Sequence, residues 1–382
     1  MPWQQSGVKA GRTWVIAPDV DTLKRRWRKL CNADKDKRVK LFKNSPTGCK
    51  IHQSKVQLPP YRRKLKPISE LSKKAPLPDI MRYAYRSFDR QHIFADARLI
   101  DRPGPLLWAT HGDHQVYVTS LLTEVLGKGP ALTACADIPD LHHFSGRGAK
   151  DVIPLYRDAA GQEPNVLPGL LDLLGETYGC EVSPEDFLAY VYGVLAQPAF
   201  TERFYEELET RELRVPLTKD PKLFERAAKI GRYLLWLHTY GQRFTGRGRP
   251  KGRIPRGKAR CTKPVSERPK DYPDHFEYDP ESKRLIVGTG VFEPVKPEVY
   301  EFEVSGLKVV QSWLGYRMKS GQGKKSSPLD DIRPKHWTAQ FTTELLELLW
   351  VLEKTIATYP RQEQRNFEQP SIYWRRVAVR GG

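Results

Sequence analysis

Three residues near position 280 have the types that metal-dependent phosphodiester cleavage needs. Asp274 is followed by Glu281 and Lys283 in the order Pro-Asp…Glu-x-Lys, in which two carboxylates hold Mg²⁺ and the lysine activates a water. The spacing is short, and Glu281 precedes its predicted strand instead of lying on it. We interpret the pattern as a chance match and keep a weak metal-dependent nuclease as an alternative.

The run His111-Gly112-Asp113-His114 offers imidazoles and a carboxylate as metal ligands. No third part of such a site is evident, and a polar turn before a strand explains the run better. No nearby Cys or acid completes a site with His142 and His143 either. The five cysteines form no Cys-x-x-Cys pair, and no Walker-type phosphate loop is present. The sequence therefore predicts no bound metal and no catalytic residue.

The stretch Leu58-Pro59-Pro60-Tyr61 differs by one residue from Asn-Pro-Pro-Tyr, the catalytic loop of amino-methylating DNA methyltransferases. There the Asn side-chain oxygen and the first proline's carbonyl accept hydrogen bonds from the amine of a flipped-out base, and the aromatic ring stacks on that base. Leu58 has no side-chain oxygen. Only 57 residues precede the stretch, too few for the doubly wound sheet whose Gly-rich turn holds a cofactor. We interpret it as a proline linker.

Positive charge is concentrated in two segments of the chain. The total is 64 Lys and Arg against 45 Asp and Glu, a net charge of +19. Residues 1–75 hold 20 basic and 5 acidic side chains, and residues 243–264 hold nine basic and no acidic ones. A surface that neutralises phosphates gathers its cations, whereas a merely solvated surface spreads them. The pattern favours a nucleic-acid partner, with duplex DNA and RNA both open at this point.

The bulk composition indicates a folded chain without a membrane anchor. Of the 382 residues, 39% are hydrophobic, which is enough for a substantial core. No apolar run approaches the ~20 residues that span a bilayer, and the first residues lack the features of a signal peptide. Together with the scattered cysteines, this predicts a cytoplasmic protein.

Hydrophobic periodicity predicts an α+β fold, with mixed sheets at both ends of the chain around a helical middle and a long buried C-terminal helix. Strands are expected within residues 12–17, 80–108, 114–122, 130–138, 284–295 and 299–306. Helices are expected over residues 19–42, 164–178, 183–196, 202–212, 221–240, 306–318 and 338–358. Gly, Arg and Pro exclude a regular element from residues 243–264 and predict a loop or arm there.

Six segments occur in a specific combination and order: "WQQSGVKAGRTW" (3–14), "RYAYRSFDRQHIFADARLIDRPGP" (82–105), "DIPDLHHFSGRG" (137–148), "GLKVVQSWLGYRM" (306–318), "KKSSPLDDIRP" (324–334) and "FTTELLELLWVLEKTI" (341–356). Together they resemble the C-terminal portion of type ISP restriction–modification enzymes, from about Trp3 to about Tyr359. In that family one polypeptide carries a nuclease, an ATP-driven translocase, an adenine-N6 methyltransferase and finally a target-recognition domain.

The resemblance implies a sequence-specific specificity domain for double-stranded DNA in the bacterial cytoplasm, without catalysis of its own. It implies no cofactor in this chain, because S-adenosylmethionine, ATP and Mg²⁺ would belong to missing upstream domains. Those methyltransferase and translocase domains are implied partners, in the same or a separate chain. The alternatives are a subunit of an adenine-N6 methyltransferase that is active with a partner, the weak nuclease, and an RNA-associated basic protein.

Pattern and resemblance together divide the chain into six parts. These are a basic segment from the methyltransferase–specificity junction (1–75), a β-rich part (76–160), a helical subdomain (161–242), a basic arm (243–264), an α+β C-terminal part (265–360) and a tail (361–382).

Candidate DNA contacts are of two kinds, because phosphate contacts position a protein while base-edge contacts read sequence. For phosphates we nominate the arm residues Arg247, Arg249, Lys251, Arg253, Arg256, Lys258 and Arg260. A second basic patch is Arg25, Arg26, Arg28 and Lys29, which the family analogy would place beside the methyltransferase. The opposing interpretation of the arm is a disordered basic linker.

For base reading, the sequence offers residues 306–325 and the Gly-bounded loop after residue 141. Arg makes bidentate hydrogen bonds to guanine, and Gln makes them to adenine. The apolar positions of residues 306–325 equally suit a supporting core helix. The candidates are Lys308, Gln311, Arg317, Lys319, Lys324, Lys325, His142, His143 and Arg147. Arg82, Arg86 and Arg90 either clamp the DNA backbone or form buried pairs with Asp89, Asp96 and Asp101.

Overall fold

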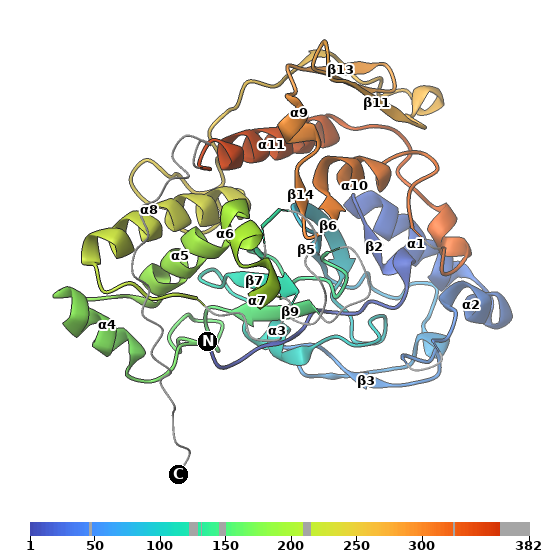
Figure 1. The fold of residues 1–382 in the computed structure, drawn as a ribbon. Coiled ribbons are helices and arrows are strands. Elements are labelled where there is room, and N and C mark those ends of the chain that lie inside the picture. The colour runs from blue at the N-terminus through green and yellow to red at the C-terminus, as the bar shows by residue number, and fades with distance from the viewer. Residues whose placement is uncertain are drawn as a thin grey trace.

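The computed structural model describes residues 1–45, 48–121, 129–130, 132–144, 150–208, 215–323 and 325–359. Figure 1 shows helices packed around several small sheets, which confirms the predicted α+β class. Among these residues, no helix has both the length and the apolarity that crossing a membrane requires.

Helices occur at both ends and in the middle of the chain. They are α1 (Val20–Asn32), α2 (Lys35–Phe42), α3 (Pro105–Ala109), α4 (Leu170–Tyr178), α5 (Pro184–Leu195), α6 (Pro198–Arg203), α7 (Tyr205–Leu208), α8 (Pro221–His238), α9 (Pro297–Tyr300), α10 (Val309–Gly315) and α11 (Ala339–Ile356). The long C-terminal helix is α11, and its Leu345, Leu348 and Leu349 are fully buried, as its apolar sequence predicts.

Antiparallel pairing joins the strands into three larger sheets and two hairpins. The first sheet has the order β2 (Ile16–Ala17), β6 (Asp89–Phe94), β5 (Ile80–Arg86). The second has the order β1 (Gln5–Ser6), β9 (Lys150–Pro154), β7 (Tyr117–Leu121), β8 (Leu132–Cys135). The third has the order β10 (Arg260–Lys263), β13 (Gly290–Glu293), β12 (Arg284–Val287), β11 (Phe276–Asp279). The hairpins are β3 (Lys55–Val56) with β4 (Lys64–Leu65), and β14 (Glu303–Val304) with β15 (Leu307–Lys308).

Three hydrophobic cores hold these elements together. The first lies mainly within residues 8–152, the second within residues 116–235, and the third mainly within residues 236–352. Leu329 nevertheless joins the first core and Phe88 joins the third. Side chains from distant parts of the sequence therefore share each core, and the division into six parts stays a prediction.

Capping explains where the structure departs from the predicted helix over residues 19–42. Asp19 caps α1, since its carboxylate accepts a hydrogen bond from the Thr22 backbone N–H. A second cap, Asp34, accepts from the backbone N–H of Lys37 and starts α2 after an extended residue, Ala33. The single predicted helix is therefore two helices.

The C-terminal expectations are also partly wrong. The strand expected over residues 299–306 holds α9 and only the short β14, because Pro297 occupies the first turn of a helix there. The helix expected over residues 306–318 begins at Val309, since Leu307 and Lys308 pair with β14 as strand β15. The first error reflects the helix start at Pro297 and the second the short β14–β15 hairpin, and side-chain periodicity encodes neither.

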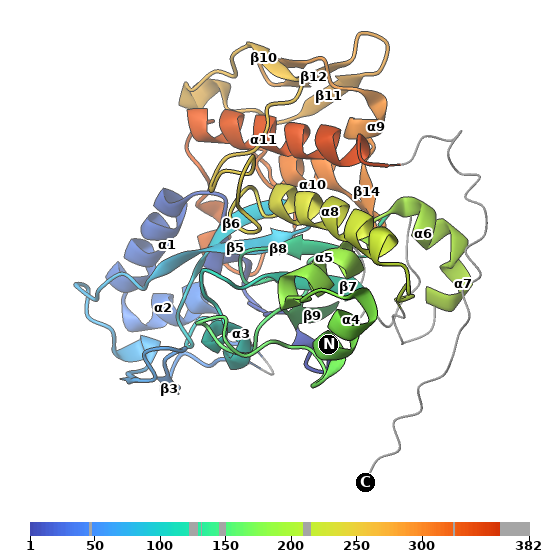
Figure 2. The same cartoon turned by 90° about the vertical axis from the view of Figure 1, so that its left-hand side faces the viewer.

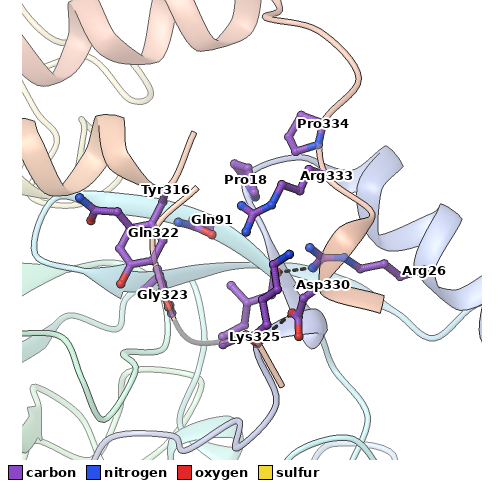
Figure 3. A pocket seen from close by; sticks show the side chains of 13 residues that line it. Pro18, Arg26, Gln91, Tyr316, Gln322, Gly323, Lys325, Asp330, Arg333 and Pro334 are labelled. Atoms are coloured by element: carbon purple, nitrogen blue, oxygen red, sulfur yellow. Dashed lines mark hydrogen bonds between the residues drawn. The ribbon is translucent and has the colours of Figure 1, made fainter. Parts of the chain in front are cut away.

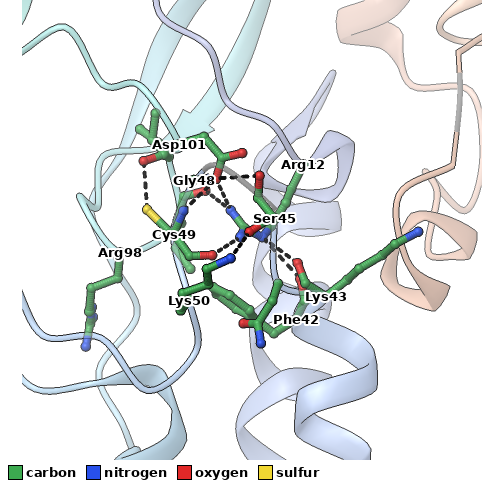
Figure 4. Close-up of polar contacts among 12 residues, drawn as sticks. Arg12, Phe42, Lys43, Ser45, Gly48, Cys49, Lys50, Arg98 and Asp101 are labelled. Atoms are coloured by element: carbon green, nitrogen blue, oxygen red, sulfur yellow. Dashed lines mark hydrogen bonds and ion pairs between the residues drawn. The ribbon is translucent and has the colours of Figure 1, made fainter.

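A buried arginine binds the N-terminal segment to the loops around it (Figure 4). The guanidinium of Arg12 donates to the carbonyls of Phe42 and Cys49, the latter at 2.6 Å, and lies 2.7 Å from Asp101. Arg26 and Arg38 are also buried and donate to backbone carbonyls. Part of the basic charge of residues 1–75 is therefore internal and unavailable to a partner.

The end of α8, which leads into the basic arm, is held by close helix packing. A Cβ on Gly231 would lie 1.7 Å from the Ala189 carbonyl oxygen, so α5 and α8 approach this closely only because glycine is present. His238 then bridges Tyr192 of α5 and Thr355 of α11 through its two ring nitrogens. Burial lowers the pKa of His238 to about 3, so the ring stays neutral in this bridge.

Candidate nucleic-acid interface

Two adjoining hollows lie where α8 ends. The central hollow, of about 350 Å³, is bounded by the β5–β6 hairpin, the end of β8 and residues 238–243. The arm hollow, of about 510 Å³, is bounded by the start of α5, by α8 and by the basic arm. Asp113, Gln242 and Arg243 line both hollows, so the two hollows adjoin at these residues, and together they are called the concave surface below.

The basic arm (residues 243–264) borders the arm hollow with its first part, up to Lys251, and then crosses from the end of α8 to the outer sheet (Figure 2). The indole N–H of Trp236 donates to the Pro250 carbonyl, and Glu353 of α11 accepts from the Ala259 backbone N–H. Trp350 donates to the Ala259 carbonyl at 2.8 Å. These bonds tie the arm to α8 and α11, and its last residues form β10.

Five of the seven nominated arm cations are exposed and, among the residues that the structure describes, take part in no ion pair or side-chain hydrogen bond. They are Arg247, Lys251, Arg253, Arg256 and Lys258. Arg249 is partly buried, and its Nε atom has no hydrogen-bond partner. Arg260 is turned onto the protein, where it donates to the carbonyls of Gly257 and Ala259.

Charge in the arm hollow is mixed, with a basic excess. Arg232 pairs with Asp186, and Glu185 accepts a hydrogen bond from Tyr156. Burial, and then repulsion from Arg249, lower the pKa of Arg232. The arm hollow therefore presents cations that its own acids do not fully neutralise.

Arginines of the β5–β6 hairpin line the central hollow in ion pairs with acids that the sequence did not suggest. Arg82 lies 2.7 Å from Glu344, Arg90 lies 2.7 Å from Glu347, and Arg86 lies 3.5 Å from Asp140. The predicted partners are occupied elsewhere, since Asp89 pairs with Arg317, Asp96 with Arg98 and Asp101 with Arg12. The pairing interpretation fits this geometry better than a backbone clamp does, although the assigned acids were wrong.

Arg317, one of the candidates for base reading, is wholly inside the protein. Its side chain has 0% exposure, lies 2.9 Å from Asp89 and 3.7 Å from Glu344, and stacks on Trp313. Its side chain cannot reach a groove of DNA in this fold, so the prediction that Arg317 contacts bases is wrong. Its helix α10 is a supporting element, as its apolar positions allowed.

The other candidates around α10 are partly engaged. Lys308 pairs with Glu301 at 2.7 Å, and Lys325 pairs with Asp331 at 2.7 Å, both on the exposed surface. Lys319 is exposed and lies 3.9 Å from Asp274, whereas the side-chain oxygen of Gln311 is buried without a partner. Lys324 lies outside the described residues.

A third hollow next to this region is too small for a base (Figure 3). It holds about 60 Å³, less than half of the ~150 Å³ that accommodates a benzene ring. Arg26, which belongs to the second predicted basic patch, lines this hollow. Its guanidinium donates hydrogen bonds to the backbone carbonyls of Trp14, Ile16 and Ile332. Arg25 donates to a backbone carbonyl as well, while Arg28 and Lys29 are exposed.

Of the two predicted loop histidines, only His142 is exposed. His143 is buried and contacts Thr133 and the Ala84 carbonyl, and burial lowers its pKa to about 4. His143 is therefore a core residue and not a groove contact, which corrects that candidate. Arg147 lies outside the described residues.

Neither sequence pattern for chemistry forms a site. Asp274 and Glu281 lie beyond opposite ends of β11, and no group of three potential metal ligands occurs among the described residues. Leu58 is 4% exposed and packs in the first core next to the β3–β4 hairpin. The Leu58–Tyr61 stretch is thus part of the connection between β3 and β4, anchored by the buried Leu58, while Tyr61 is 64% exposed.

Sequence reasoning did not single out Gln242 or Arg243, and it interpreted residues 111–114 as a polar turn, with metal binding as the less favoured alternative. Asp113, Gln242 and Arg243 line both hollows, and His114 lines the arm hollow. Arg243 stands at the start of the basic arm, and this was the signal that could have found it. Nothing in the sequence places residues 111–115 beside the arm, because that neighbourhood arises from tertiary packing.

The chain matches the family described as "Type ISP C-terminal specificity domain" over residues 1–348. A search of curated protein sequences gave no match. Among solved structures, a DrdV–DNA complex aligns with a TM-score of 0.61 at 16% identity, covering 92% of this chain and 34% of that one.

Two Type ISP restriction–modification enzymes align similarly. The nuclease-deletion mutant of LlaGI in complex with a DNA substrate mimic has a TM-score of 0.57 at 16% identity, with 93% of this chain and 27% of that chain covered. The ATP-dependent enzyme LlaBIII bound to DNA has a TM-score of 0.60 at 15% identity, with 93% and 23% covered. The chain thus spans between about a quarter and a third of the length of these proteins, and the likeness shows a shared fold.

Proposed function

The chain belongs to the family of Type ISP C-terminal specificity domains, and we propose that it reads the sequence of double-stranded DNA without catalysing a reaction itself. The observation that carries this proposal is the basic arm, which borders the arm hollow through Arg249 and Lys251 and carries five exposed cations without ion pairs among the described residues. Lys and Arg contacts to phosphates supply most of the affinity of such proteins for DNA. The similar structures are of proteins solved with DNA, which supports the same reading.

In this proposal, cationic and other polar side chains contact different parts of the DNA. The arm holds the phosphate backbone, and polar side chains in the hollows inspect base edges, because phosphate contacts alone carry no sequence information. We further propose that S-adenosylmethionine, ATP and Mg²⁺ act on other segments of a complete enzyme, with which this chain works in the bacterial cytoplasm.

Selection from a random pool of DNA duplexes tests the proposal. We expect the purified chain to enrich one motif and to bind it at least about 1,000-fold more tightly than a scrambled duplex at physiological salt, a ratio typical of specific readers. RNA of matched length should compete no better than the scrambled duplex. A pool that shows no enriched motif, or RNA that competes as well as the motif, would contradict sequence-specific reading of duplex DNA.

A further inference from the structure

The turn formed by residues 111–115 lies at the meeting point of the two hollows. His111 lines the central hollow, His114 lines the arm hollow, and Asp113 lines both. Gln242, which also lines both hollows, belongs to the segment that leads from α8 into the basic arm. Side chains at this junction therefore line the same arm hollow as Arg249 and Lys251 of the basic arm.

Side-chain hydrogen bonds from Arg243 and Gln115 fix the backbone of this turn. Arg243 donates its Nε to the Gln115 carbonyl at 2.8 Å and one terminal nitrogen to the Gly112 carbonyl at 2.9 Å. The buried Gln115 side chain donates to the carbonyls of Thr110 and Tyr156. These bonds hold both ends of the turn against neighbouring elements.

Close packing fixes the middle of the turn as well. A Cβ on Gly112 would lie 2.1 Å from the Ala159 carbonyl oxygen, and one on Gly161 would lie 2.7 Å from the Cβ of His114. The turn is thus pressed against residues 159–161, and any side chain at position 112 would displace it. Its backbone is preorganised, which is what accurate placement of a recognition group requires.

The polar side chains of this turn, and that of Gln242, are not engaged by other described residues. Asp113 and His114 are exposed, Gln242 is half-buried, and none of the three side chains has a hydrogen bond or ion pair among the described residues. A carboxylate next to an amide and an imidazole gives acceptors as well as donors. Phosphates call for donors alone, whereas base edges present both kinds of group.

We propose that Asp113 and Gln242 read base edges that carry an exocyclic amine, adenine or cytosine, in the DNA duplex held by the basic arm. The inference rests on the proposed function and names the residues that give it specificity. The Asp113 carboxylate accepts from the cytosine N4 or adenine N6 amine, and the Gln242 amide pairs with the N6 and N7 of adenine. Arg243 is a positioning residue, because it acts on the turn and not on the base.

The test repeats the duplex selection with Asp113→Ala and Gln242→Ala, and with Glu281→Ala as a control. Glu281 is an exposed acid in the distant β11–β12 turn, so its replacement should return the wild-type motif. For each hollow variant we expect the preference for adenine or cytosine at one position to fall by about 10- to 100-fold, the size of a good base contact. Preferences elsewhere in the motif, and the salt dependence of binding to a scrambled duplex, should stay unchanged.

Two results would overturn the inference, and they are distinguishable. If the wild-type chain yields a motif and both variants yield the same motif, the turn does not read bases, while the proposed function stands. If the wild-type chain yields no motif, the proposed function fails first and the inference fails with it. Thermal unfolding of each variant, compared with the wild type, establishes that a lost preference is not lost folding.

Discussion

Replacing the five exposed arm cations with glutamine is expected to weaken binding to every DNA duplex alike. The variant carries Arg247→Gln, Lys251→Gln, Arg253→Gln, Arg256→Gln and Lys258→Gln. Each lost phosphate contact lowers the slope of log K against log salt by about 0.9, so the slope should fall by up to about 4.5. Affinity at low salt should fall by orders of magnitude, while the selected motif should persist. Fluorescence titrations at several salt concentrations measure both quantities.

A matched control removes five exposed lysines from the N-terminal 75 residues, on and around α2 and the β3–β4 hairpin. These are Lys35, Lys40, Lys64, Lys73 and Lys74. Figure 1 shows α2 and β3 on the far side of the molecule from α8, from whose end the arm runs. An equal loss of slope in both variants would indicate diffuse attraction to a basic protein, and the arm would then have no special role.

Arg317→Leu is expected to destabilise the fold by about 3–5 kcal/mol, because it leaves the carboxylate of Asp89 buried without its partner. Asp89 is only 2% exposed, so water cannot replace the lost arginine. Glu344, the second acid that Arg317 contacts, keeps its ion pair with Arg82. Urea unfolding measures the free energy of unfolding. Adding Asp89→Asn to Arg317→Leu should recover part of the loss, since the second change removes the buried charge.

Lys319→Met provides the control for Arg317→Leu. Lys319 lies two residues further on and is exposed, so its replacement should change the free energy of unfolding by less than about 0.5 kcal/mol. An Arg317→Leu protein that unfolds at the wild-type urea concentration but has lost its sequence preference would restore Arg317 as a reader of bases.

The α+β class and most helices follow from the sequence because local rules determine them. The capping box at Ser183 starts α5 as the Ser-Pro-Glu-Asp stretch predicts, and Thr338 caps the buried helix α11. The errors in the predicted helices occurred where a local signal was overlooked: the Asp34 cap divides residues 19–42 into α1 and α2, and residues 303–308 form the β14–β15 hairpin in place of the first turn of a longer helix.

At the candidate interface, the sequence shows local properties but not tertiary ones. The density of cations in residues 243–264 located the arm, because charge composition is a local property. Which arginines are free is a tertiary property: Arg317 and Arg12 look like surface cations in the sequence but are buried in ion pairs with Asp89 and Asp101. The run at Asp113 was interpreted as a polar turn, because the sequence does not show that Arg243 holds it beside the arm.

Hydrogen–deuterium exchange of the chain, with and without its selected duplex, tests the central claim most directly. If the concave surface embraces DNA, bound duplex should slow amide exchange in residues 245–258 and 112–115, while exchange in the outer β11–β12 hairpin and in α2 should stay the same. Unchanged exchange in both the arm and the 112–115 turn, with protection appearing elsewhere, would contradict this account of how the chain binds DNA.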